Sequence, residues 1–479
     1  MKKNIGVCLG ILGLALGVVG APAARAQGRM AASGSGGAAD TSAPSTPVTP
    51  AASSPADLRL RIDALKAELA ALNAELATEK DGDSAASTAA PQGQGSTTPA
   101  TTPPAEAPAA APAPAPLPTP SMAGPLATAV PHELGEGPFG KLEVTGILSG
   151  MGLTQSNWGA AGTADTPTHW DLSNAQIFIQ KTTGWFQFYL QGGAYNLPAL
   201  GTTFLGTPDT VKGFYGPFPQ GYVKLVKGNF NVEVGALPTL IGAEYTFTFE
   251  NMNIERGLLW NQENAVNRGI QLNETYKKLT VAFSWNDGFY SNRYNWLSGS
   301  LTYAFNASNT LAFVGMGNAG TYARVSATSV ATPLLLNNSN IYNLLYTYTK
   351  GPVTITPYYQ YTVVKANPSI GILAGAHTSG GAILANYSFK RGVSLAVRPE
   401  YIKSSGTVLD PNAINLLYGP GSGAFAFTVT PTYVKDGFFL RADFSIVHAT
   451  NTTPAFAVFG PTGLKVNQPR GVIEAGFMF

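Results

Sequence analysis

The stretch YVKLVKGNFNVEVGAL, residues 222–237, alternates apolar and polar residues on both sides of Gly228-Asn229. A period of two predicts a strand whose two faces have different surroundings, and Gly-Asn between two such runs predicts a tight hairpin. Closing the turn at these two residues places Lys224 opposite Glu233 on the polar face. A single pairing therefore satisfies the turn, the alternation and the charges together.

The same alternation recurs from residue 141 to the end of the chain. The polar face of two later segments carries Arg398 with Glu400, and Arg441 with Asp443, while the opposite face is apolar. We predict about sixteen strands, near residues 142–154, 172–181, 184–195, 218–227, 230–238, 268–275, 278–288, 295–305, 310–318, 341–349, 353–364, 379–389, 393–404, 424–434, 438–449 and 471–479.

The connections between these strands distinguish a membrane barrel from a soluble sandwich, which would also suit the alternation. Short turns such as KGN and KDG alternate throughout with long loops rich in Gly, Asn, Pro and Thr. An even number of strands, with short turns on one rim and long loops on the other, is typical of bacterial outer-membrane barrels. The fold class is therefore all-β, an antiparallel transmembrane barrel over residues 140–479.

Three prolines fit this pattern poorly, because proline cannot donate a hydrogen bond to a β-ladder. Pro357, Pro399 and Pro431 lie inside predicted strands, in the sequences TPYY, RPEY and TPTY. Local bulges are the expected explanation.

The N-terminus has the features of a secretory signal peptide. Two lysines precede an apolar run, and small residues at Ala24 and Ala26 predict cleavage after Ala26, which assigns residues 1–26. The only cysteine, Cys8, lies within this segment, so a closed sheet has to supply the rigidity that disulfides give many exported proteins.

Three segments lie between the signal peptide and the barrel. Residues 27–53 are predicted to be disordered, and the Pro/Ala-rich residues 81–139 are predicted to be an extended linker. Residues 54–80 contain a heptad pattern that predicts a self-associating coiled coil, without fixing dimer against trimer. An amphipathic helix lying on another surface is the alternative. The seam residues are Leu58, Ile62, Leu65, Leu69, Leu72 and Leu76.

Two stretches carry a family resemblance. GVIEAGFMF, residues 471–479, resembles the closing strand of an outer-membrane protein, which implies that the barrel assembly machinery recognises Phe477 and Phe479 and that this strand pairs with the first. GALPTLIGAEYTFTFENMNIERGLLWNQENAVNRGIQL, residues 235–272, resembles the OmpL-like β-barrel porin family. That resemblance implies passive diffusion of small hydrophilic solutes and ions through a water-filled lumen. The preceding heptads resemble those of porins with a periplasmic coiled coil, which are trimeric.

The resemblance also implies a candidate functional site, because the third outer loop of sixteen-stranded porins folds inward and narrows the pore. The corresponding loop, residues 239–267, is acidic, and an ordinary solvated surface loop is the alternative. Carboxylates facing guanidinium groups across a narrow gap would create a transverse field. The predicted constriction comprises Glu244, Glu250, Glu255, Arg256 and Glu263. The predicted pore wall comprises Lys224, Glu233, Arg398, Glu400, Arg441 and Asp443, with a simple salt bridge preferred for Lys224 and Glu233.

An enzyme is not expected. The chain has only four histidines, and Asp443 and Ser445 lie on the opposite face of their strand from His448. No cofactor, metal site or nucleic-acid partner is expected either. Two other functions remain open: a tether whose coiled coil binds peptidoglycan while the barrel is closed, and a substrate-specific channel. The expected location is the bacterial outer membrane, in contact with its lipids, with the N-terminal segment in the periplasm; solute identity, ion preference and gating are not predicted.

Overall fold

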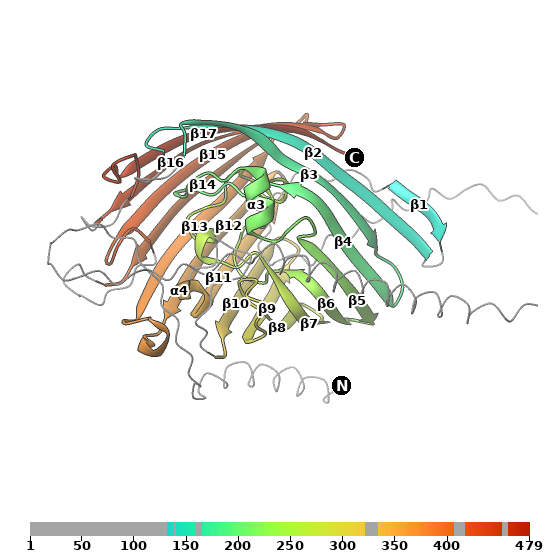
Figure 1. Cartoon of the computed structure of the whole chain (residues 1–479). Helices are drawn as coiled ribbons and strands as arrows, with labels where there is room; N and C mark the ends of the chain where they lie inside the picture. Colours follow the sequence, from blue (N-terminus) through green and yellow to red (C-terminus); the bar gives the residue numbers. More distant parts are fainter. Residues whose placement is uncertain (1–131, 138–139, 159–164, 321–333, 407–416, 453–457) are drawn as a thin grey trace, which may run out of the picture. The chain divides into compact units, whose positions relative to one another are not determined.

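The computed structural model describes residues 132–137, 140–158, 165–320, 334–406, 417–452 and 458–479. The predictions for the signal peptide, the segment 27–53, the coiled coil and nearly all of the linker lie outside the described residues. Within them, the dominant feature is one antiparallel sheet that closes on itself (Figure 1).

Sixteen strands, β2 to β17, form this barrel, and each pairs with its neighbours in the chain. Their bounds agree with the predicted strands to within a few residues, so the predicted barrel is confirmed. The strands are β2 Gly140–Gln155, β3 Thr168–Lys181, β4 Phe186–Tyr195, β5 Gln220–Lys227, β6 Phe230–Pro238, β7 Val266–Tyr276, β8 Leu279–Asn286, β9 Trp296–Asn306, β10 Asn309–Asn318, β11 Ser339–Lys350, β12 Val353–Val364, β13 Ala376–Ser388, β14 Val393–Ser404, β15 Gly423–Lys435, β16 Phe438–Thr450 and β17 Asn467–Met478.

The barrel closes where the last strand meets the first. β17 pairs with β2 from Arg470 opposite Gln155 to Met478 opposite Ile147. Phe479 then exchanges two backbone hydrogen bonds with Gly146, of 2.7 and 3.0 Å. Its ring covers this glycine so closely that an added Cβ would lie 2.4 Å from the ring. The predicted pairing of the C-terminal strand with the first strand is confirmed.

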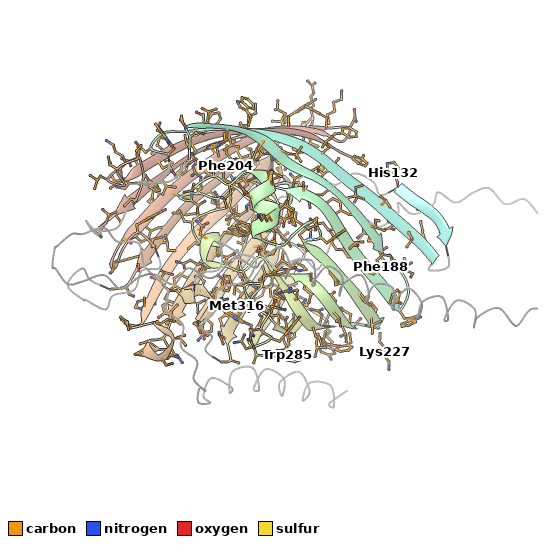
Figure 2. All side chains as sticks on the ribbon, in the orientation of Figure 1. His132, Phe188, Phe204, Lys227, Trp285 and Met316 are labelled. Carbon is orange, nitrogen blue, oxygen red and sulfur yellow. The ribbon has the colours of Figure 1, made fainter. Side chains whose placement is uncertain are left out.

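The two faces of the wall differ as the alternation predicts, with side chains projecting from both (Figure 2). Large apolar side chains on the outward face remain exposed, Trp285, Leu395 and Phe444 among them. Arg398 and Arg441 lie on the inward face, where both are buried. Because the wall is one closed sheet, the apolar face forms the band that faces lipid and the polar face lines the interior.

The hairpin of β5 and β6 has the predicted register, with Lys224 directly opposite Glu233. Short turns and long loops alternate around the barrel, and the loop between β6 and β7 is the third long one. The short turns lie at one rim, together with the start of β2 and the end of β17, and the long loops lie at the other rim.

The predicted bulges at the three strand prolines are wrong. The register is continuous across Pro357, Pro399 and Pro431, and two consecutive pairs are simply missing from the ladder on one side of each proline. The missing N–H therefore interrupts the hydrogen bonding locally without inserting a residue.

A further strand, β1 (His132–Gly137), lies in the last residues of the predicted linker and was not expected. It pairs antiparallel with the start of β2, from Gly137 opposite Gly140 to His132 opposite Val144. β17 leaves this part of the β2 edge unpaired, so β1 continues along the same edge beyond Phe479.

Short helices lie in the long loops: α3 (Thr207–Gly213), α4 (Leu334–Asn337) and the 3-10 turns η1 (Thr248–Glu250), η2 (Trp260–Gln262) and η3 (Pro368–Ile370). Among the residues described here, no helix has the length and apolar character that crossing a membrane requires.

Candidate functional site

The third long loop, residues 239–265, lies inside the barrel (Figure 1). Every residue in it except Asn261 is buried. Its partners are inward-facing side chains of the wall, which a loop exposed on the cell surface could not reach. The structure therefore places all five residues of the predicted constriction in the interior, whereas their role in permeation stays a prediction.

Apolar side chains fix one side of the loop. Ile241 and Leu259 belong to a buried cluster that also contains the inward-facing Val314 of β10 and Ile341 of β11. The Gln360 side chain of β12 donates a hydrogen bond of 3.0 Å to the carbonyl of Leu259. The loop thus has an apolar patch that burial against the wall stabilises.

Arg398 of β14 holds the middle of the loop. Its guanidinium contacts the Glu244 carboxylate and donates to the carbonyl of Glu255 at 2.8 Å. Glu400, on the same strand, lies 3.4 Å from Arg398 Nε and accepts the backbone N–H of Leu258 at 3.1 Å. One wall strand therefore binds both charged groups and main-chain groups of the loop.

Arg441 of β16 holds the segment around η1. It pairs with Glu474 of β17 at 2.7 Å and donates to the carbonyls of Thr248 and Asn251 at 2.5 and 2.9 Å. The Thr248 hydroxyl donates to the same Glu474 carboxylate at 2.7 Å and accepts from Asn174 of β3, also at 2.7 Å.

Arg470 of β17 joins the second and third long loops. It pairs with Glu255 at 2.9 Å, and it donates to the carbonyls of Ala199 and Thr202 in the loop between β4 and β5. Asp443 of β16 accepts the backbone N–H of Glu255 at 2.8 Å. Glu255 is therefore held from two wall strands.

The expected gap between facing charges is absent at these pairs, because loop carboxylates contact the arginines directly. Arg398 pairs with Glu244 as its place on the wall suggested, whereas Arg441 pairs with a wall glutamate rather than with the loop. Sequence reasoning missed Arg470 and Glu474. The signal was available for Glu474, which alternates with Ile473 and Phe477 in the predicted last strand, whereas Arg470 lies one residue before that strand.

Among the residues that the structure describes, Glu250, Arg256 and Glu263 of the loop form no ion pair. Neither carboxylate oxygen of Glu263 and no guanidinium nitrogen of Arg256 has a hydrogen-bond partner among the described residues. Burial, with the nearby Glu244 and Glu400 charges, raises the pKa of Glu263 well above its usual value. Burial also lowers the pKa of Arg256 to about 10 and raises that of Glu250 to about 7.

Lys224 and Glu233 form an ion pair of 3.2 Å on the inward face of β5 and β6. The pair joins two adjacent strands, and the Lys224 ammonium is directed at Glu233 on the neighbouring strand. The salt bridge preferred from the sequence is the arrangement observed.

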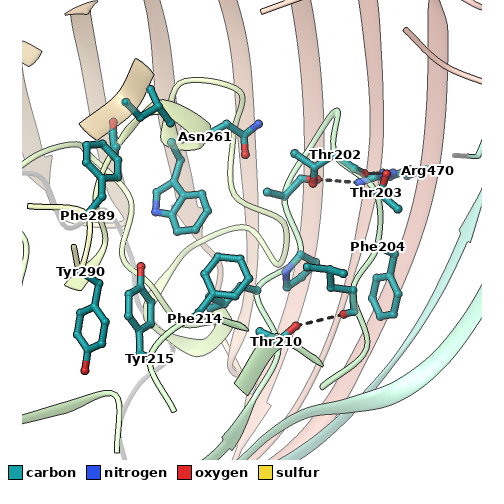
Figure 3. Close-up of a pocket in the computed structure, with 17 residues that line it drawn as sticks. Thr202, Thr203, Phe204, Thr210, Phe214, Tyr215, Asn261, Phe289, Tyr290 and Arg470 are labelled. Carbon is teal, nitrogen blue, oxygen red and sulfur yellow. Dashed lines mark hydrogen bonds between the residues drawn. The ribbon is translucent and has the colours of Figure 1, made fainter. Parts of the chain in front are cut away.

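A cavity of about 310 Å³ lies among the long loops (Figure 3). Residues of the second, third and fourth long loops line it, together with Leu336 of the fifth and Arg470 of β17. Phe289, Tyr290 and Tyr215 lie at one end in the figure, and Arg470 lies at the other end with Thr202 and Thr203. In the part of the chain that the structure describes, no group of His, Cys, Asp and Glu is arranged to hold a metal ion.

Comparison with known proteins gives one family and several similar structures. The family model described as "Putative beta-barrel porin-2, OmpL-like" matches residues 141–479. No curated protein sequence matches the chain. An anion-selective porin from Comamonas acidovorans is 12% identical over 71% of this chain and 99% of that chain, with a TM-score of 0.47. OmpT of Vibrio cholerae is 10% identical over 72% and 98%, with a TM-score of 0.47. OmpF of Salmonella typhi is 11% identical over 71% and 98%, with a TM-score of 0.46.

Proposed function

Because this chain belongs to the OmpL-like β-barrel porin-2 family, we propose that it is an outer-membrane porin for passive diffusion of small hydrophilic solutes and ions. The observation that supports this most directly is the third long loop, held inside a closed barrel by Arg398, Arg441 and Arg470. A loop fixed to one part of the wall sets the cross-section that is left for solutes. Loop 239–265 is accordingly the element that limits solute size.

The permeation path follows the wall of β5 to β9. The hydrogen bonds and ion pairs described above run from the loop to β3, β12, β14, β16 and β17. On the other side, inward-facing Asn231, Thr280 and Thr302 are half-buried, uncharged and polar. Amide and hydroxyl groups can exchange hydrogen bonds with a hydrated solute without binding it as strongly as a fixed charge would. Because Glu244 and Glu255 are neutralised by contact, we expect weak selectivity between cations and anions.

Electrical recording tests this proposal. Purified protein in a planar bilayer should give stable conductance steps, and a trimer should give them in multiples of three. A reversal potential measured across a salt gradient should lie close to zero. A barrel that inserts and remains silent would contradict the porin proposal.

A closed tether is the second candidate, and the direct contact between the loop and the wall favours it. Three arginines hold the loop without an intervening gap, and a plug would need that arrangement too. In this case the N-terminal coiled coil would bind peptidoglycan. Co-sedimentation of the full-length protein with purified peptidoglycan, combined with silence in the bilayer, would identify the tether. A substrate-specific channel would instead conduct and be blocked by its own solute.

The remaining parts of the proposal concern assembly. Residues 1–26 direct export, and the coiled coil of residues 54–80 lies in the periplasm and supports a homotrimer. Phe477 and Phe479, which are both exposed toward lipid where β17 pairs with β2, form the signal for the barrel assembly machinery. The heptad leucines and the position of the C-terminal strand support these assignments.

A further inference from the structure

The cavity among the long loops has the dimensions of a ligand site. Its volume of about 310 Å³ corresponds to roughly ten water molecules. Small-molecule sites are concave, mostly apolar and lined by a few polar groups, and this volume lies at the lower end of their range. The cavity is formed by the long loops and therefore lies toward their end of the barrel.

Aromatic rings form much of the cavity wall. Phe214, Tyr215, Trp260, Phe289 and Tyr290 all line it. Tyr215 and Tyr290 meet edge to face with their ring centroids 5.2 Å apart, so the edge of one ring is directed at the face of the other. Several ring faces around a small volume attract a cation, because each face carries partial negative charge.

The same wall contains an uncompensated acid. Glu263 lines the cavity and is 6% exposed, and its carboxylate oxygens have no hydrogen-bond partner among the described residues. The carboxyl packs against Gly242, where an added Cβ would lie 1.8 Å from Oε2. The charges that act on it most strongly are Glu244 and Glu400, which have the same sign. Burial favours the neutral acid, and a positive charge in the cavity would favour its ionised form even without direct contact, because the surroundings are poorly screened.

Two of the three arginines near the cavity form ion pairs, and the third, Arg256, lies outside its lining. Arg470 is paired with Glu255 at 2.9 Å, and it lies at the opposite end of the cavity from Phe289 and Tyr290 (Figure 3). Arg256 does not line the cavity and lies over the Trp260 ring, 5.6 Å from its centroid.

Arg268, whose guanidinium stacks on Tyr290, is likewise paired, with Asp287 at 2.8 Å.

We propose that this cavity is a binding site for a small organic cation, whose ammonium group lies among the aromatic rings with Glu263 as its counter-charge. The site does not depend on conduction, because a silent barrel would retain it.

Calorimetry with two isosteric probes tests this inference on the full-length protein in detergent. Choline and 3,3-dimethylbutan-1-ol have the same shape, but only choline carries a positive charge. We expect choline to bind saturably and the neutral alcohol to bind at least tenfold more weakly. Equal affinity for the two probes, or no binding of choline, would overturn the proposal.

Two variants locate the site. Glu263→Gln keeps the size of the side chain and removes its charge, so it should weaken choline binding at least tenfold, whereas Glu250→Gln in the same loop should leave it unchanged. Phe289→Leu removes one ring without touching the acid and should also weaken binding. Heat-modifiable migration on gels confirms that each variant is folded. Unaltered choline affinity in both Glu263→Gln and Phe289→Leu would place the cation elsewhere and refute the assignment.

Discussion

Arg398, Arg441 and Arg470 each bind a carboxylate and also one or two main-chain carbonyls of a loop. A carbonyl cannot be removed by substitution, so these arginines recognise the path of the loop as well as its charges. Removing one partner of a buried ion pair typically costs about 3–5 kcal/mol, because the other charge remains desolvated. The loop is therefore held by individually strong contacts that a neutral side chain could not replace.

Glu250 should make the stability of the buried loop depend on pH. Its pKa is raised to about 7 by burial, so folding favours the protonated form. The resulting stabilisation is complete below pH 4.5 and is lost as the pH rises through 7. Glu250→Gln should match the wild type near pH 4 and be more stable at pH 8, by up to about 3 kcal/mol. The temperature of the heat-modifiable transition, measured at both pH values, checks this.

Glu255→Gln is the matched control, because it removes a paired carboxylate from the same loop. It should lower the transition temperature at pH 8, since Arg470 would lose its ion pair. If both glutamine variants changed stability in the same direction at pH 8, the distinction drawn between paired and unpaired loop carboxylates would be wrong.

Among the structural elements, the strands could be predicted from the sequence, whereas most contacts between the loops and the wall could not. Alternation is a local signal, and the pairing of Lys224 with Glu233 follows from a two-residue turn. The contact of Glu244 with Arg398 joins residues 154 positions apart and depends on the path of the whole loop. Arg470 was not assigned to the inward face because the predicted last strand begins one residue later, at residue 471, whereas β17 begins at Asn467. Its partner Glu255 could be recognised only once the loop was placed.

The closing strand provides a test of assembly. Deleting Phe479 removes two backbone hydrogen bonds to Gly146 and the ring that covers it. We expect less folded, heat-modifiable protein in the outer membrane. Phe444→Leu is a suitable control, because Phe444 is also exposed toward lipid but lies away from the seam. Equal amounts of folded protein in the deletion variant and the wild type would exclude a role for Phe479 in assembly.

The permeation path can be mapped with single cysteines, because the only natural cysteine, Cys8, lies in the predicted signal peptide. Thr302→Cys and Ala304→Cys place thiols on the inward face of β9, where both positions are half-buried, and Ala426→Cys places one at a buried position of β15. A hydrophilic thiol reagent should reduce conductance in the β9 variants and leave the β15 variant unaffected. If the reagent reduced conductance in the β15 variant and not in the β9 variants, the path would lie along the part of the wall that we assign to holding the loop.

For the whole molecule, the heptads and the barrel should be separable. Replacing Leu65 and Leu72 by glutamate should abolish the helix oligomer, because each buried seam leucine contributes about 1.5–3 kcal/mol. Conductance per subunit should remain, since the barrel closes through β2 and β17 within one chain. Cross-linking that gave the same oligomers in the variant would show that residues 54–80 pack against another surface.

The position of β1 determines where mechanical load enters the barrel. Tension on the N-terminal segment reaches His132 first, on the same edge of β2 that Phe479 occupies two residues farther along. The five residue pairs of β1 with β2 would separate one after another, while the nine pairs of β17 with β2 remained intact. β1 should therefore detach before force reaches the pairing of β17 with β2 that closes the barrel. Pulling on residue 131 in a single-molecule force experiment should give a short, low-force extension before the barrel unravels, and unravelling in a single step would show that β1 bears no separate load.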